Sequence, residues 1–123
     1  MSTKDLVKNY LDSDQVKLVV ESSETLFSTI ISKMSFKELL SLRNTILDDN
    51  FKQLMKDSDM VNCIEEFFKY NLNVAETSRN SYLHRNTLLY RIDKIYHLTG
   101  YNLKIFEDAV SFKILMKIYE LTS

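Results

Sequence analysis

Polar side chains that can read DNA bases are grouped in one short stretch of the chain, between His84 and Lys94. An arginine can donate two hydrogen bonds to guanine O6 and N7, and an asparagine can pair in the same way with adenine N6 and N7. Thr, Tyr and Lys side chains can contact phosphates, which sets the register of a protein on the duplex. We therefore predict a DNA-contacting surface made of His84, Arg85, Asn86, Thr87, Tyr90, Arg91 and Lys94.

These side chains can act together only if a helix presents them, and the sequence predicts such a helix over Arg85–Leu98. Gly100 ends it, because glycine suits the left-handed position just past a helix. The buried face would consist of apolar residues spaced three or four apart, namely Leu88, Ile92 and Ile95. The exposed face would carry Arg85, Asn86, Leu89, Tyr90 and Asp93, with Thr87, Arg91 and Lys94 at its flanks.

A second short helix is predicted immediately before it, over Val74–Asn80, with a tight turn at Ser81–His84 between the two. Asn73 followed three positions later by Glu76 is a capping pattern that starts this helix. Ser78 is the small residue that the helix crossing needs, and Leu83 is the apolar plug of the turn. His84 is the cap of the second helix. Together these features predict a helix-turn-helix, whose second helix enters the major groove of DNA.

Basic charge is concentrated in the same quarter of the chain. The formal net charge of the whole chain is −1, which alone argues against a nucleic-acid binder. Residues 73–104, however, hold five Lys and Arg against two Asp and Glu, whereas residues 1–72 hold nine against twelve. An acidic remainder reduces nonspecific adhesion to polyanions and leaves one attractive face.

The motif His84–Ile92, which reads HRNTLLYRI and is followed by LTG at 98–100, resembles the C-terminal helix-turn-helix of PucR/CdaR-type transcription regulators. With Asn73-Val74, Leu103 and the flanking amphipathic helices, the resemblance covers about Asp59–Leu121. It implies a Fis-like helix-turn-helix and DNA binding through His84, Arg85, Asn86, Thr87, Tyr90 and Arg91.

Two departures from this family stand out. Asn80 and Ser81 occupy positions where the family usually has Ala and Leu, so we expect the first helix to pack less tightly. Only 58 residues precede the match, fewer than the family's usual sensory regions. We therefore do not carry the family's effectors over to this chain.

Composition predicts an all-α fold, a helical bundle with a C-terminal helix-turn-helix. The 123 residues include no proline and a single glycine, whereas sheet proteins need turn residues about every ten positions. A chain of this length forms one domain, or two small parts that share a core. We divide it into an N-terminal helical region at 1–57, a candidate for dimerisation, and a DNA-binding part at 58–123.

Helices are predicted elsewhere along the chain from apolar spacing and caps. They cover Thr3–Leu11, Gln15–Met34, Phe36–Leu47 after a Ser35 cap, Phe51–Met55, Met60–Tyr70 and Glu107–Leu121, with an interruption at Asp48-Asp49-Asn50. A short strand is the alternative at Val16–Val20. The apolar stripe Val16–Met34 either forms a dimer interface or closes the core of the monomer, and both interpretations stay open.

Other classes of protein lack support in the sequence. The lone Cys63 excludes an internal disulfide and a thiolate zinc cluster, and we predict that it is buried and inert. The segments 12–14 and 57–59 suggest calcium loops but lack the required glycine and late glutamate, so we interpret them as helix caps. No catalytic set, cofactor motif, metal site or small-molecule pocket is predicted, and we expect the protein not to be an enzyme.

Four further residues in or near the predicted motif are expected to have structural roles and not to contact DNA. His97 is expected to interact with the helix dipole, and Tyr82, Tyr96 and Tyr101 are expected to pack and not to stack on bases. No apolar run reaches 18 residues and none follows a basic start, so we expect a cytoplasmic protein without a membrane segment.

Two functions are therefore considered. The main hypothesis is a sequence-specific DNA-binding transcription regulator that acts on double-stranded DNA, as a homodimer through its N-terminal helices or as a monomer. The alternative is a helical protein-interaction module, an adaptor or antirepressor, in which the same helices bind another regulator.

Overall fold

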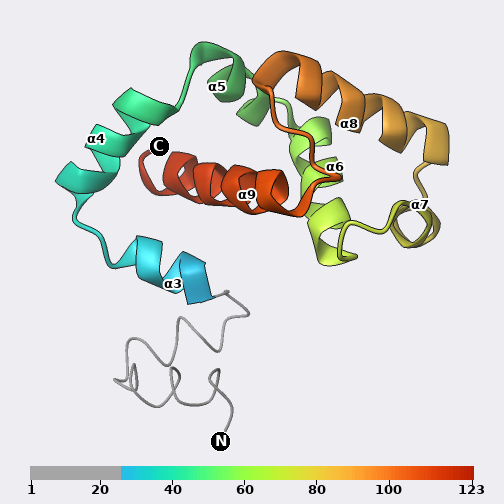
Figure 1. Ribbon diagram of the computed structural model, residues 1–123, viewed down its shortest axis with the longest axis horizontal. Coiled ribbons are helices and arrows are strands. Elements are labelled where there is room, and N and C mark those ends of the chain that lie inside the picture. The colour runs from blue at the N-terminus through green and yellow to red at the C-terminus, as the bar shows by residue number, and fades with distance from the viewer. Residues whose placement is uncertain (1–25) are drawn as a thin grey trace, which may run out of the picture.

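The computed structural model describes residues 26–123, and within this range it contains seven helices and no β-strand (Figure 1). They are α3 (Leu26–Ser32), α4 (Phe36–Ile46), α5 (Asp49–Met55), α6 (Ser58–Lys69), α7 (Val74–Ser81), α8 (Arg85–Thr99) and α9 (Phe106–Leu121). The prediction of an all-α fold is confirmed. The helix expected at Thr3–Leu11 and the first eleven residues of the one expected at Gln15–Met34 lie outside the described residues.

The terminal helix α9 lies in the middle of the molecule, with α3 and α4 at one end and α7 and α8 at the other (Figure 1). Both α3 and α4 contact it directly. On its buried side, the centre of the Phe112 ring lies 5.1 Å from the ring centre of Phe51 in α5. It lies 5.9 Å from the ring centre of Tyr101, which precedes α9. Aromatic pairs at such separations stabilise a core beyond the area that they bury. The helix therefore joins the N-terminal helices to the C-terminal ones.

Polar residues begin four of the helices, which explains how the chain turns so often without proline. The side chains of Ser35, Asp48, Asp57 and Asn73 each accept a hydrogen bond from the backbone N–H three positions later, at 2.8 to 3.2 Å. Such a cap satisfies one of the free N–H groups in the first turn. Because Asp48 is a cap, α5 begins at Asp49, and the interruption predicted to extend through Asn50 is shorter than expected.

One hydrophobic core contains residues from both sides of the boundary drawn at 57/58. Leu39, Phe51 and Leu54 belong to the same buried cluster as Phe67 and Phe112. The two parts therefore share a core, and their division stays a prediction about function.

The structure describes the C-terminal part of the apolar stripe Val16–Met34, and residues of this part lie both in the interior and at the surface. Ile31 is buried in the core, whereas Leu26 and Ile30 are 47% and 56% exposed. Helix α3 ends at Ser32, two residues before the predicted end. None of the described helices is long and apolar enough to cross a membrane.

Candidate nucleic-acid interface

The pair α7–α8 forms the predicted helix-turn-helix, and Ser78 fixes its turn. The Ser78 carbonyl oxygen accepts hydrogen bonds from the backbone N–H groups of Tyr82 and Leu83. The Ser78 hydroxyl donates to the carbonyl oxygen of Leu83, whose half-buried side chain packs against the core. The small residue and the apolar plug expected from the sequence thus occupy their predicted places.

The second helix of the motif begins at a histidine cap, as predicted. Nδ1 of His84 accepts a hydrogen bond from the backbone N–H of Asn86 at 3.1 Å. A neutral imidazole that accepts at Nδ1 carries its proton on Nε2, so this second N–H remains available as a donor. The first turn of α8 contains no acidic residue. Its free backbone N–H groups can therefore bind an anion such as a phosphate.

The inner face of α8 is buried, which determines the direction of the opposite face. Leu88 and Ile95 have no exposed surface and Ile92 is 2% exposed, as the spacing predicts. The helix ends at Gly100, which has a φ of 81° and whose N–H donates to the Tyr96 carbonyl oxygen at 2.8 Å. The helix is thus held at both ends and along its whole length.

The predicted contact residues divide into two groups by exposure. His84, Arg85, Asn86, Tyr90 and Lys94 are exposed, and Tyr90 is 66% exposed. Thr87 and Arg91, which were expected at the flanks, are half-buried. All seven lie on α8 or directly before it.

Arg91 points toward the neighbouring helix α6, which the sequence did not predict. Its guanidinium group lies near enough to the thiol of Cys63 in α6 to influence the ionisation of that thiol. Burial raises the pKa of the Cys63 thiol, while the guanidinium group of Arg91, a positive charge and a potential hydrogen-bond donor, opposes the rise. Cys63 is buried and unpaired, as expected. Because part of Arg91 is occupied in this contact, it lies at the edge of the exposed surface and not at its centre.

The expectation that three tyrosines pack is correct for only one of them. Tyr101 is half-buried against Phe112. Tyr82 is 97% exposed, with a left-handed φ of 55°, and Tyr96 is 47% exposed beside His97. The sequence contained one signal against packing of Tyr82, because this residue lies in the turn and outside the apolar repeat of either helix. Its ring is exposed two residues before the cap of α8.

The unusual pair Asn80-Ser81 has local hydrogen-bond partners. The Ser81 hydroxyl donates to Oε2 of Glu66 at 3.0 Å, which connects α7 to α6. The Asn80 side-chain amide donates to the Glu76 carbonyl oxygen at 2.8 Å. A polar contact between α7 and α6 is thus present where the family usually has an apolar residue.

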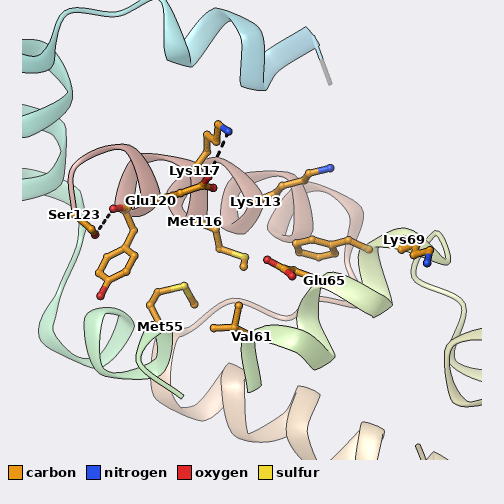
Figure 2. A pocket seen from close by; sticks show the side chains of 11 residues that line it. Met55, Val61, Glu65, Lys69, Lys113, Met116, Lys117, Glu120 and Ser123 are labelled. Carbon is orange, nitrogen blue, oxygen red and sulfur yellow. Dashed lines mark hydrogen bonds and ion pairs between the residues drawn. The ribbon is translucent and has the colours of Figure 1, made fainter. Parts of the chain in front are cut away.

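An open cleft of about 590 Å³ lies between α6 and α9, and the sequence did not predict it (Figure 2). Met55, Val61, Phe68 and Met116 supply apolar surface. Charged residues of both signs line it as well, including Lys117, whose Nζ lies 3.9 Å from Oε1 of Glu120. A second hollow of about 390 Å³ shares Phe68 and Lys113 with it. Over residues 26–123, no group of three or more His, Cys, Asp and Glu side chains could hold a metal ion.

Comparison with known proteins gives a family match that includes α7 and α8. Residues 60–118 match the PucR C-terminal helix-turn-helix domain. The purine catabolism regulatory protein of Bacillus subtilis is 22% identical over 94 residues, which are 76% of this chain and 18% of that protein. The carbohydrate diacid regulator of Escherichia coli is 35% identical over 54 residues, which are 44% of this chain and 14% of that protein.

A relative of another kind is the tRNA1(Val) (adenine(37)-N6)-methyltransferase of Cytophaga hutchinsonii. It is 28% identical over 109 residues, which are 89% of this chain and 43% of that protein. The chain thus spans less than half the length of each of these three relatives. None of the solved structures matches the chain significantly.

Proposed function

Because residues 60–118 form a helix-turn-helix domain of the PucR C-terminal family, we propose that this protein is a sequence-specific, DNA-binding transcription regulator. The observation that carries the proposal is the exposed row on α8. His84, Arg85 and Asn86 stand at its N-terminus, above a fully buried inner face. The two relatives named as regulators support it, and the proposed role is not enzymatic. Such a protein acts where the chromosome lies, in the bacterial cytoplasm.

In this proposal the N-terminal half of α8 enters the major groove. Arg85 and Asn86 lie in the first turn and reach base edges, because helix-turn-helix proteins read bases with the start of the second helix. His84 donates from Nε2 to a phosphate, while Tyr90 and Lys94 contact the strand along the groove. Thr87 and Arg91 contribute from the flanks, and Arg91 also supports the helix against α6.

A second copy of the chain would supply the second half-site. One helix-turn-helix makes few base contacts, and two-fold dimers read half-sites about one turn of DNA apart. Helices α3 and α4 lie at the end of the molecule away from α8 (Figure 1). Both helices have large apolar residues that are exposed. They include Leu26, Ile30, Phe36 and Leu40, with exposed fractions from 38% to 61%. We therefore assign dimerisation to residues 1–57 and DNA binding to 58–123.

Sedimentation of the full chain tests this assignment. We expect a dimer for the native sequence and a monomer for the double variant Ile30→Glu with Phe36→Glu. Phe106→Glu is the matched control, because Phe106 is also an exposed apolar residue, at 72%, but lies at the start of α9, outside residues 1–57. This variant should remain a dimer. A monomeric native chain, or loss of the dimer only in the control, would refute the assignment.

Selection of bound sequences from a pool of random duplexes tests DNA binding itself. A common site should emerge, and affinity for it should fall steeply with added salt, because phosphate contacts release counterions. Arg85→Ala should weaken binding to that site by roughly 1–3 kcal/mol and relax preference at one base pair. Lys37→Ala on α4 is the matched control for loss of an exposed cation and should leave affinity unchanged.

A protein-interaction module is the second candidate, and the cleft between α6 and α9 favours it. Its apolar surface and charges of both signs would suit an amphipathic helix of another regulator, as in other helix-in-groove complexes. The two functions differ in a simple measurement. If the chain shifts no duplex from mixed genomic fragments at low salt, the DNA-binding proposal fails and the interaction module remains.

A further inference from the structure

Tyr82 has an unusual combination of backbone conformation and exposure. It lies in the turn between α7 and α8 with a φ of 55°, a region that most residues avoid because Cβ crowds the following carbonyl oxygen. Its side chain is 97% exposed, so the fold gains almost no packing from the ring in return. Neither the turn nor the core accounts for a tyrosine at this position.

The backbone that carries Tyr82 is rigid. Its N–H donates to the carbonyl oxygen of Ser78, and the Ser78 hydroxyl donates across the turn to Leu83. Beside it, the Ser81 hydroxyl bonds to Glu66 on α6 at 3.0 Å. The ring therefore projects into solvent from a fixed base, two residues before the cap of α8.

We propose that the Tyr82 hydroxyl donates a hydrogen bond to a phosphate oxygen of the DNA strand beside the groove that α8 enters. This inference rests on the proposed function and adds a positioning residue to it. Tyrosine hydroxyls are established donors to phosphates, and such contacts set the register without carrying sequence information. A tyrosine also orders few torsions when it binds, so little conformational entropy is lost.

The variant Tyr82→Phe in the full chain tests the hydroxyl alone. Binding is measured to two duplexes of equal length, one selected from a random pool and one of mixed sequence that lacks the selected site. We expect both affinities to fall by about tenfold, because a hydrogen bond to a charged group is lost in each complex. The ratio of the two affinities should stay the same. The dependence on salt should also stay the same, since a neutral hydroxyl releases no counterion.

Two further variants separate this role from folding and from a general effect of surface aromatics. Tyr82→Asn accepts the left-handed backbone, so it should melt no lower than the native chain and still bind both duplexes more weakly. Phe106→Ala removes an exposed ring from the start of α9 and should leave both affinities unchanged.

The outcomes distinguish this inference from the proposed function. If the native chain binds the selected duplex and Tyr82→Phe binds both duplexes equally well, the inference is overturned and the proposed function stands. A loss on the selected duplex alone also overturns it, because Tyr82 would then read a base. If the native chain binds neither duplex, both ideas fail together.

Discussion

The guanidinium group of Arg43 on α4 donates hydrogen bonds to the carbonyl oxygen of Thr122 at 2.8 Å and to the Thr122 hydroxyl at 3.0 Å. Thr122 follows the last residue of α9, where the helix dipole is negative and the last carbonyl groups lack helical partners. The same cation lies 5.3 Å from the centre of the Tyr119 ring. Because α9 also packs on the helices that support α8, this contact connects the N-terminal helices to the helix-turn-helix part.

Replacement of Arg43 by alanine should therefore lower the free energy of unfolding by about 1–3 kcal/mol, as urea denaturation would measure. The hydrogen bonds, the dipole interaction and the contact with Tyr119 are all lost. Lys37→Ala removes an exposed cation from the same helix and should change the free energy by less than about 0.5 kcal/mol. Equal effects of the two substitutions would show that the contact at Thr122 contributes nothing.

At the helix crossing, Ser78→Leu should destabilise the protein more than Ser78→Ala. Alanine loses only the hydrogen bond to Leu83, which costs about 1 kcal/mol. Leucine must also push α7 and α8 apart, and such overpacking adds roughly 1–3 kcal/mol. Thermal unfolding measures both effects. A leucine variant as stable as the alanine variant would mean that the crossing has room, contrary to the predicted need for a small residue.

Local signals in the sequence were enough to predict the helices that the structure describes and the exposure of most candidate contact residues. The caps at Ser35, Asp57 and Asn73 each involve a side chain and a backbone group three residues apart, so they can be recognised without the fold. The inner face of α8 follows from a period that any helix imposes. For the same reason, the exposed positions of Arg85 and Asn86 could be predicted in advance.

Contacts between distant segments could not be predicted in this way. The apolar period of α8 indicates which side of the helix carries Arg91. That Arg91 lies near Cys63, however, depends on how α6 packs against α8. The cleft between α6 and α9 likewise depends on the packing of helices far apart in the chain. The exposure of Tyr82 was missed because an aromatic residue usually packs, whereas the left-handed turn directs this one into solvent.

Cys63 should make the stability of the protein depend on pH in the alkaline range. Burial raises the pKa of its thiol above the ordinary value of a cysteine, so the folded state holds the proton more tightly. The resulting stabilisation is complete below the unfolded pKa and is lost as the pH rises through the folded pKa. The difference in free energy of unfolding between the native chain and Cys63→Ala should therefore shrink above about pH 8.5, the ordinary pKa of a cysteine. Comparing the two cancels the titration of other groups, and a constant difference would contradict the expectation.

The same burial should protect the thiol from modification. A water-soluble thiol reagent can reach Cys63 only when the protein opens, so the labelling rate should follow the opening equilibrium and rise with urea. Arg43→Ala provides a matched test, because a less stable chain that opens globally should be labelled faster by the same factor. Fast labelling of the native chain at neutral pH would show that α6 separates locally from its neighbours.

The C-terminal end of α8 allows backbone strain to be measured without steric clash. Gly100 has a φ of 81°, and a Cβ atom placed there would meet nothing within 4 Å. Gly100→Ala should therefore lower the free energy of unfolding by about 1–2 kcal/mol through conformational strain alone. Gly100→Asn should lower it less, because asparagine tolerates the left-handed region better. Urea denaturation measures both, and affinity for DNA should stay unchanged, since the proposed base contacts lie at the opposite end of α8. A loss of affinity without a loss of stability would mean that the end of α8 also touches DNA.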